Sequence, residues 1–181
     1  ATSNTGEFNQ TNPDIRFSQL NTPQSQINAV RRKYEGTDQW MKAPNGEPTK
    51  LNEMQWLQVR TPNFKAWFGD WENDPKNASQ VVDSNGEPLV VYHGTRADFN
   101  TFAGRQAWQA IYNEEIGTSY FTSDKEMAMG YSGGREPKSV YLSFKTPYAY
   151  DANGQSYISA NFTSLKEAKL HDFDSVLIKN V

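Results

Sequence analysis

The spacing of apolar residues changes character along the chain, from helical before about residue 71 to strand-like after residue 80. In the first region, apolar residues recur at intervals of three and four between residues 25 and 36, at Ile27, Val30 and Tyr34. This spacing predicts one apolar face on a short helix.

A pair of helices is predicted over residues 51–71. Asn52 and Thr61 have side chains that suit helix N-caps, and Pro62 suits a first helical position. Gly69 is a typical stop signal. The pair carries three tryptophans, Trp56, Trp67 and Trp71. We expect these rings to pack the helical segment against the rest of the chain.

After residue 80 the pattern predicts short strands joined by turns. Asn85-Gly86 lies between two apolar runs, which is typical of a β-hairpin, and we expect strands at Val81–Asp83 and Pro88–Tyr92. Asn-Gly-Glu-Pro also occurs at 45–48, which we interpret as a similar turn and not as a structural repeat. Further strands are expected at Ser119–Thr122, Ser139–Phe144, Tyr148–Tyr150 and Ser175–Lys179, with a short one within Asp14–Ser18.

Two short helices are expected among these strands. The first runs from Asp124 to Tyr131, with Ser123 as its cap and Glu126 placed as in a capping box. The second spans Ser164–Leu170. Strands that outnumber helices in this way predict an α+β domain.

Composition narrows the function classes. The formal net charge of −3 argues against a general phosphate-backbone binder, and the absence of cysteine rules out disulfides and cysteine-based metal sites. With two histidines in the chain we expect no metal site, and no apolar run reaches membrane-spanning length. Residues 1–24 are polar and read as a linker or tail.

Three side chains are candidates for chemistry. His93 follows an apolar strand and precedes Gly94, which lets a ligand approach the backbone closely. Tyr120 lies at the end of an expected strand, and Tyr131 lies at the end of the helix that follows it. Their two rings can therefore face each other across a slot that suits a flat cationic heteroaromatic ring such as nicotinamide. The alternative for each is a structural side chain. Ser132-Gly133-Gly134-Arg135 reads as a turn, with an anion-binding loop as the alternative.

Taken together, Tyr92-His93-Gly94-Thr95 and Tyr120-Phe121-Thr122-Ser123, followed by a helix ending in Tyr131, resemble the histidine–tyrosine branch of the ADP-ribosyltransferases. That branch includes diphtheria-like toxins and poly-ADP-ribose polymerases. Residues 67–180 are more similar still to ADP-ribosyltransferase-like domains of polyvalent proteins from phages and conjugative elements, through Trp67-Phe68-Gly69-Asp70 and Phe173-Asp174-Ser175-Val176.

The resemblance implies a fold of two packed mixed or antiparallel sheets with flanking short helices, here preceded by a helical segment. It implies NAD as co-substrate and no metal. His93 would bind the ribose hydroxyls, the Gly94 backbone would pair with the carboxamide, and Tyr120 and Tyr131 would sandwich the nicotinamide ring. Thr95 would lie beside the adenosine.

The segment 100–115 would cover the donor, and we expect Arg105 within it to meet the pyrophosphate. The family's acidic residue, which stabilises charge at C1′ and orients the acceptor, has two interpretations here. It is Asp174, or the third motif lies beyond the end of the chain, whose last strand is then missing. Glu114 and Glu115 are weaker alternatives. Ala128 stands where related polymerases have a carboxamide-binding serine.

We therefore expect a tail over 1–24, a helical segment over 25–75 and an ADP-ribosyltransferase-like domain over 76–181. The function expected is mono-ADP-ribosyl transfer to a host protein or nucleic acid by a toxin-like mobile-element protein, in or delivered into a bacterial cytoplasm, without membrane association. The alternatives are a catalytically incomplete NAD-binding module and a protein-interaction module. An RNA 2′-phosphotransferase fits poorly, because its site needs several arginines and histidines.

Overall fold

A computed structural model of the chain describes residues 17–18, 22–97, 119–156, 159–160, 164 and 175–179. The helices are α1 (Gln24–Tyr34), α2 (Glu53–Val59), α3 (Pro62–Phe68) and α5 (Lys125–Tyr131), with a 3₁₀ turn at Pro75–Asn77. The strands are β1 (Phe17–Ser18), β2 (Val91–His93), β3 (Lys138–Leu142), β4 (Tyr148–Asp151) and β5 (Val176–Lys179). The described part is therefore α+β, as expected.

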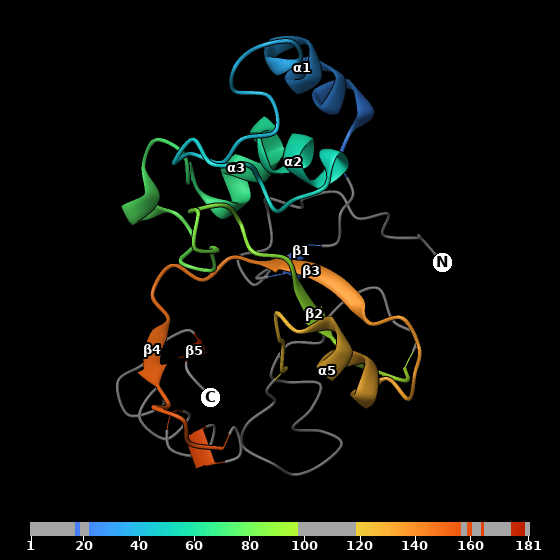
Figure 1. Cartoon of the computed structure of the whole chain (residues 1–181), viewed down its shortest axis with the longest axis vertical. Helices are drawn as coiled ribbons and strands as arrows, with labels where there is room; N and C mark the ends of the chain where they lie inside the picture. Colours follow the sequence, from blue (N-terminus) through green and yellow to red (C-terminus); the bar gives the residue numbers. More distant parts are fainter. Residues whose placement is uncertain are drawn as a thin grey trace.

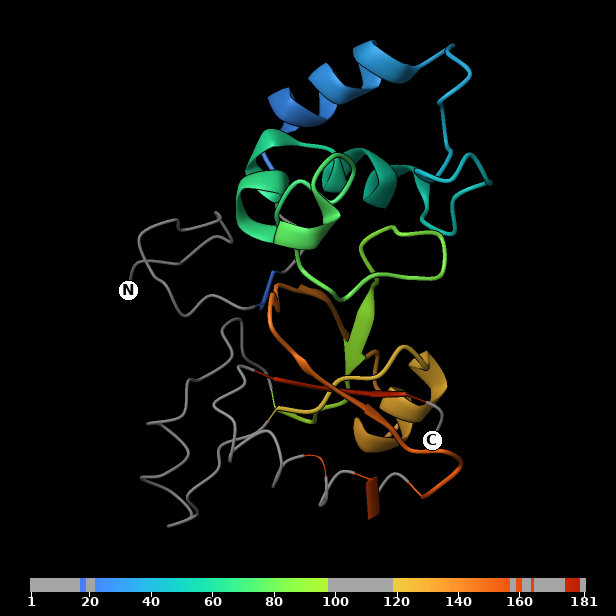
Figure 2. The ribbon, with the colours of Figure 1, turned by 90° about the vertical axis from the view of Figure 1, so that its left-hand side faces the viewer.

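Helices α1, α2 and α3 gather at one end of the molecule, and the sheet of β1, β3 and β2 lies between them and α5 (Figure 1). A quarter turn shows the same order along the long axis (Figure 2). None of the helices in the described ranges is long and apolar enough to span a bilayer.

The helix pair forms where the capping residues predict it. The Asn52 side chain accepts a hydrogen bond from the Gln55 N–H, and the Asn52 N–H donates in turn to the Gln55 side chain, which completes a capping box. Thr61 caps α3 by accepting from the Phe64 N–H. Gly69 ends α3 with φ +102°, and a Cβ there would lie 2.4 Å from Ala78 Cα, so glycine is required.

The core of the helical segment is aromatic. Trp56 is fully buried against α1 and meets Tyr34 and Trp40 edge-on, with ring centroids 5.4 and 5.3 Å away. A second cluster joins α3 to the sheet through Phe64 and Tyr141, whose ring centroids lie 5.0 Å apart. Trp71 belongs to this second cluster and Trp67 packs against it, whereas Trp56 packs within the helical segment.

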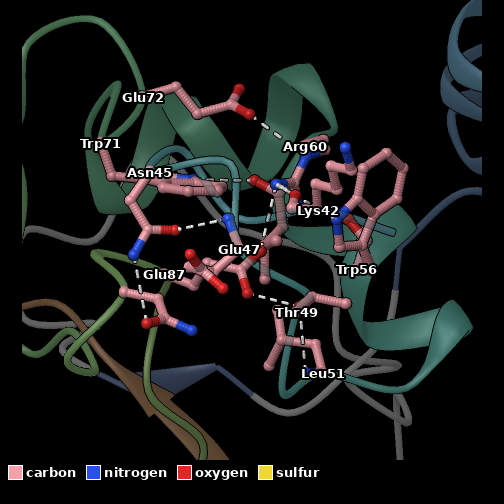
Figure 3. Close-up of polar contacts among 12 residues, drawn as sticks. Lys42, Asn45, Glu47, Thr49, Leu51, Trp56, Arg60, Trp71, Glu72 and Glu87 are labelled. Carbon is pink, nitrogen blue, oxygen red and sulfur yellow. Dashed lines mark hydrogen bonds and ion pairs between the residues drawn. The ribbon is translucent and has the colours of Figure 1, made fainter. Parts of the chain in front are cut away.

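A buried ionic cluster makes a second connection between these two parts (Figure 3). We call it the Arg60 cluster, and its members are Arg60, Glu72, Glu87, Trp56 and Trp71. The Arg60 guanidinium is 3.1 Å from Glu87 Oε1 and 3.1 Å from Glu72 Oε1, and it lies over the Trp56 ring at 3.9 Å and the Trp71 ring at 4.9 Å. Glu87 is completely buried. Burial lowers the pKa of Arg60, and the two carboxylates oppose that effect, so the ion pair persists.

Glu87 reaches Arg60 from one of two matching turns. Asn-Gly-Glu-Pro at 45–48 and at 85–88 adopt the same conformation, with positive φ of +85° at Gly46 and +82° at Gly86. Both turns close with equivalent bridges, at Lys42↔Pro48 and Val82↔Pro88. The turns lie side by side, and the Asn45 side-chain amide donates to the Asn85 side-chain carbonyl oxygen at 3.2 Å.

The strands form two small sheets. The first is antiparallel in the order β1-β3-β2, and the second is a parallel pair, β4 with β5. The expected hairpin over 81–92 is reduced to the Val82↔Pro88 bridge followed by β2, because the Val81 N–H donates to the Ser79 hydroxyl and not to the opposite segment. The expected strand Ser119–Thr122 pairs at Thr122 alone. The expected helix Ser164–Leu170 lies almost entirely outside the described residues.

Candidate active site

The end of β2 is held on both of its edges. On one side, Val91 lies opposite Val140 and His93 opposite Lys138 of β3. On the other side, the Tyr92 N–H donates to the Thr122 carbonyl oxygen at 2.8 Å, and the Thr122 N–H returns a bond at 3.0 Å. The segment that carries Tyr120 and Phe121 is thereby fixed next to the His93–Gly94 corner.

His93 is oriented by this neighbouring segment. Its Nδ1 lies 2.8 Å from the Tyr120 carbonyl oxygen. A carbonyl oxygen only accepts hydrogen bonds, so Nδ1 carries the hydrogen and Nε2 is the acceptor of the neutral ring. The ring also lies 5.4 Å from the Phe121 ring, centroid to centroid. This hydrogen bond thus holds the neutral ring in one tautomer, with its hydrogen on Nδ1.

Gly94 is where α5 approaches the strand. A Cβ at this position would lie 2.1 Å from the Ala128 carbonyl oxygen and 2.8 Å from Tyr131 Cβ. Any larger residue would therefore push α5 away from β2. The sequence suggested glycine as a means for a ligand to approach the backbone, and the structure adds a second reason, which is the close approach of α5.

Two tyrosines near this corner, Tyr120 and Tyr131, have much of their surface exposed to solvent. The exposed fraction is 56% for Tyr120 and 59% for Tyr131, which is high for side chains of this size. Tyr120 is joined to His93 through its backbone, and Tyr131 contacts Gly94 through its Cβ. The structure therefore brings His93, Tyr120 and Tyr131 to the same end of β2. We refer to these residues, with Gly94 and Phe121, as the His93 cluster.

Helix α5 sets the position of Tyr131, and its cap differs from the one expected. Asp124 caps the helix, and its side chain accepts from the N–H groups of Glu126 and Met127 at 2.9 and 3.1 Å. The sequence pattern had indicated Ser123. An aspartate one residue later fills the same position and adds negative charge at the helix N-terminus, which is favourable.

Of the other expected site residues, some lie within the described ranges and some lie outside them. Thr95 is present, and its hydroxyl accepts from the Ala97 N–H at 3.1 Å, which shapes the loop after β2. Ala128 is buried, with its carbonyl oxygen against Gly94. Asp174 and Arg105 lie outside the described residues, as do Glu114, Glu115 and the segment 100–115.

Charged residues around the cluster were not singled out from the sequence as a group. Arg96 and Arg135 are neighbours, since Arg135 Nη1 donates to the Arg96 carbonyl oxygen at 3.1 Å. Lys125 lies 2.6 Å from Glu136, and this contact raises the pKa of Lys125. The signal for Arg96 was available, because it directly follows Gly94-Thr95, but its approach to Arg135 depends on the fold.

Within the described ranges, no three His, Asp or Glu side chains gather in a group able to hold a metal ion. The site seen there consists of an oriented imidazole, exposed phenol rings and a glycine backbone at a strand end. These groups suit a ligand that combines an aromatic ring with hydroxyl groups, and they lie at one corner of an α+β fold.

A family model described as ADP-Ribosyltransferase in polyvalent proteins matches residues 83–180, just over half of the 181-residue chain. The chain belongs to this ADP-ribosyltransferase family. Family membership indicates NAD as co-substrate and ADP-ribose as the group transferred. Comparisons with curated proteins and with solved structures found no match. The matched range holds the entire His93 cluster and begins after the helical segment.

Proposed function

We propose that the His93 cluster binds the nicotinamide ribose end of NAD, in the manner of the histidine–tyrosine branch, and that the chain transfers ADP-ribose to a macromolecular acceptor. Family membership supports the donor and the reaction. The reaction breaks the bond between nicotinamide and C1′ of its ribose and joins that carbon to an acceptor nucleophile. The donor site must therefore hold the nicotinamide and orient its ribose at the same time.

The main observation in favour is the backbone of Gly94. In the described part of the chain, no hydrogen bond is made by its N–H or its carbonyl oxygen. A carboxamide offers one acceptor and a pair of donors, which is the complement of that backbone. The exposed rings of Tyr120 and Tyr131 project from the same corner and would cover the two faces of a pyridinium, which gains from contact with π-faces.

His93 would act as a positioning group for the ribose. With Nδ1 donating to the Tyr120 carbonyl oxygen, Nε2 would accept from a ribose hydroxyl. This arrangement links ribose orientation to the segment that carries Tyr120. We further propose Thr95 beside the adenosine, Arg105 near the pyrophosphate, and Asp174 as the group that stabilises charge at C1′.

The biological setting belongs to the same proposal. The motifs Trp67-Phe68-Gly69-Asp70 and Phe173-Asp174-Ser175-Val176 resemble those of polyvalent proteins from phages and conjugative elements. We therefore propose a toxin-like mobile-element protein that acts on a host protein or nucleic acid in a bacterial cytoplasm. The boundaries 1–24, 25–75 and 76–181 remain our proposed division of the chain.

Two measurements on the full chain test the function. Calorimetric titration with NAD reports binding, and release of nicotinamide reports bond cleavage. We expect His93→Ala and Tyr120→Ala each to abolish both signals. Met54→Ala is the matched control, because Met54 is an equally exposed apolar side chain on α2, at 52% against 56% for Tyr120.

The outcomes separate the candidates. Binding without release would leave an NAD-binding module that lacks its acid. Absence of NAD binding would refute the proposal and leave a protein-interaction module. Binding that survives Tyr120→Ala would show that NAD binds elsewhere on the chain.

A further inference from the structure

The loop after β2 and the turn after α5 hold two arginines against each other. Arg135 Nη1 donates to the Arg96 carbonyl oxygen at 3.1 Å. A Cβ on Gly133 would lie 2.9 Å from Arg96 Nε and 3.3 Å from its Cζ, so the Arg96 guanidinium lies directly over that glycine. Both guanidinium groups therefore belong to one small corner of the surface.

The turn that carries Arg135 is well anchored. Ser132 is completely buried, and its hydroxyl contacts the carbonyl oxygens of Met129 and Arg135. The Gly134 N–H donates to the Met129 carbonyl oxygen at 3.0 Å. Gly133 and Gly134 both have positive φ, +68° and +82°, which a non-glycine residue adopts only at a cost. The backbone at Arg135 is thus set before any ligand arrives.

The charge at this corner is not balanced by the residues that the structure describes. In the ranges that the structure describes, neither Arg96 nor Arg135 has a carboxylate partner. Glu136, which follows Arg135 in sequence, is engaged by Lys125 at 2.6 Å. Two guanidinium groups held together repel each other, and an anion between them removes the repulsion. Planar guanidinium groups bind phosphate oxygens in pairs of parallel hydrogen bonds, which makes phosphate the best-matched anion.

The corner adjoins the His93 cluster. Arg96 follows Gly94-Thr95 directly in sequence, and Arg135 follows the end of α5, whose last residue, Tyr131, contacts Gly94. A ligand that covers the Tyr131 ring would reach the arginine pair with an adjacent group. On this basis, we propose that Arg96 and Arg135 form a phosphate-binding subsite of the proposed transferase site.

This proposal rests on the proposed function for its substrate, but the arginine pair can be tested alone. The phosphate has two possible sources, the donor pyrophosphate and a phosphorylated acceptor. Inorganic pyrophosphate is the first probe, titrated calorimetrically into the full chain at low salt. We expect Arg96→Gln and Arg135→Gln each to weaken its binding about tenfold, the usual effect of losing one charge-assisted contact. Arg32→Gln, an exposed arginine on α1, is the control and should have no effect.

Two further probes identify the source. If the affinity for ADP-ribose falls by the same factor in both variants, the arginine pair binds the donor. If ADP-ribose is unaffected and a 5′-phosphorylated oligonucleotide binds more weakly, the pair binds the acceptor. Either result supports the subsite. The proposal is overturned if the wild-type chain does not bind pyrophosphate at millimolar concentration, or if both variants bind it as the wild type does.

Failure of the two proposals can be told apart. Nicotinamide release that depends on His93 and Tyr120, with pyrophosphate binding unchanged in the arginine variants, rejects the subsite and keeps the proposed function. Pyrophosphate binding that depends on the arginines, without any nicotinamide release or NAD binding, keeps the subsite and rejects the proposed function. Thermal unfolding of each variant checks that the fold is intact, which we expect because both side chains are exposed.

Discussion

Replacing Glu87 by glutamine tests whether the helical segment and the matched domain form one cooperative unit. Glu87 is 0% exposed and joins the second Asn-Gly-Glu-Pro turn to Arg60 at the end of α2. It also accepts a hydrogen bond from the Thr49 hydroxyl. Glutamine has the same shape, so the substitution removes the charge and leaves the packing nearly unchanged.

The magnitude depends on the groups that still surround Arg60. Removing one partner of a buried ion pair costs about 3–5 kcal/mol, because the other charge stays buried without compensation. Glu72 still contacts Arg60 at 3.1 Å, and glutamine keeps one acceptor oxygen, so the lower end applies. At about 3 kcal/mol, a domain of this size should melt roughly 6–12 °C lower.

The chain supplies its own control. Glu47 occupies the equivalent position of the first turn, with the same backbone conformation, but its side chain is exposed. Glu47→Gln should change the free energy of unfolding by less than about 0.5 kcal/mol. The assay is thermal unfolding followed by far-ultraviolet circular dichroism and by tryptophan fluorescence, which reports on Trp56 and Trp71 beside Arg60.

Both probes should show one transition, shifted together in Glu87→Gln. A melting temperature within about 2 °C of the wild type would refute the cost assigned to the buried charge. Separate transitions for the two probes would refute the cooperative unit. Replacing the pair together, Arg60→Met with Glu87→Met, should be less harmful than the sum of the single changes, since no unpaired charge remains.

Two further predictions concern α5 and Lys65. Gly94→Ala places a Cβ 2.1 Å from the Ala128 carbonyl oxygen, so α5 must shift, and we expect NAD binding measured by calorimetry to be lost. Gly130→Ala is the control, because a Cβ there would have nothing within 4 Å. It should retain NAD binding and stabilise the helix by about 0.5–1 kcal/mol. Retained binding in Gly94→Ala would contradict the close approach. Burial lowers the pKa of Lys65, but its contacts with Glu72 and Asp70 together outweigh burial, and the net pKa is raised. The stabilisation of the fold by charged Lys65 is therefore present below its ordinary pKa and is lost as pH rises through the raised value. Denaturant titrations should show that Lys65→Met lowers the free energy of unfolding less at strongly alkaline pH than at neutral pH. A loss of stability that does not depend on pH would contradict this.

Several elements were predictable because their signals are local. Asn52 and Thr61 cap helices within a few residues of themselves, and the structure has α2 and α3 at those positions. The two Asn-Gly turns follow from the ease with which glycine adopts positive φ. The Gly94 corner and the family were also predictable, since the motifs around His93 and Tyr120 are short and contiguous.

Other features depended on residues far apart in sequence. The expected strand Ser119–Thr122 reduces to a single bridge, because β2 offers it only the two backbone groups of Tyr92. The cap moved from Ser123 to Asp124, since both side chains suit the position and local sequence does not separate them. Asp174 and Arg105 lie outside the described residues and remain predictions.

The sequence by itself determined the helix caps, the turns, the α+β class and the residues that mark the family, since each depends on neighbours within a few positions. Only the tertiary structure decided that Arg60 meets Glu87 across 27 residues, and that Arg96 meets Arg135 across 39. Nothing in either local pattern selects its partner. Charged side chains pair according to which surfaces the folded core brings together, and that depends on the whole chain.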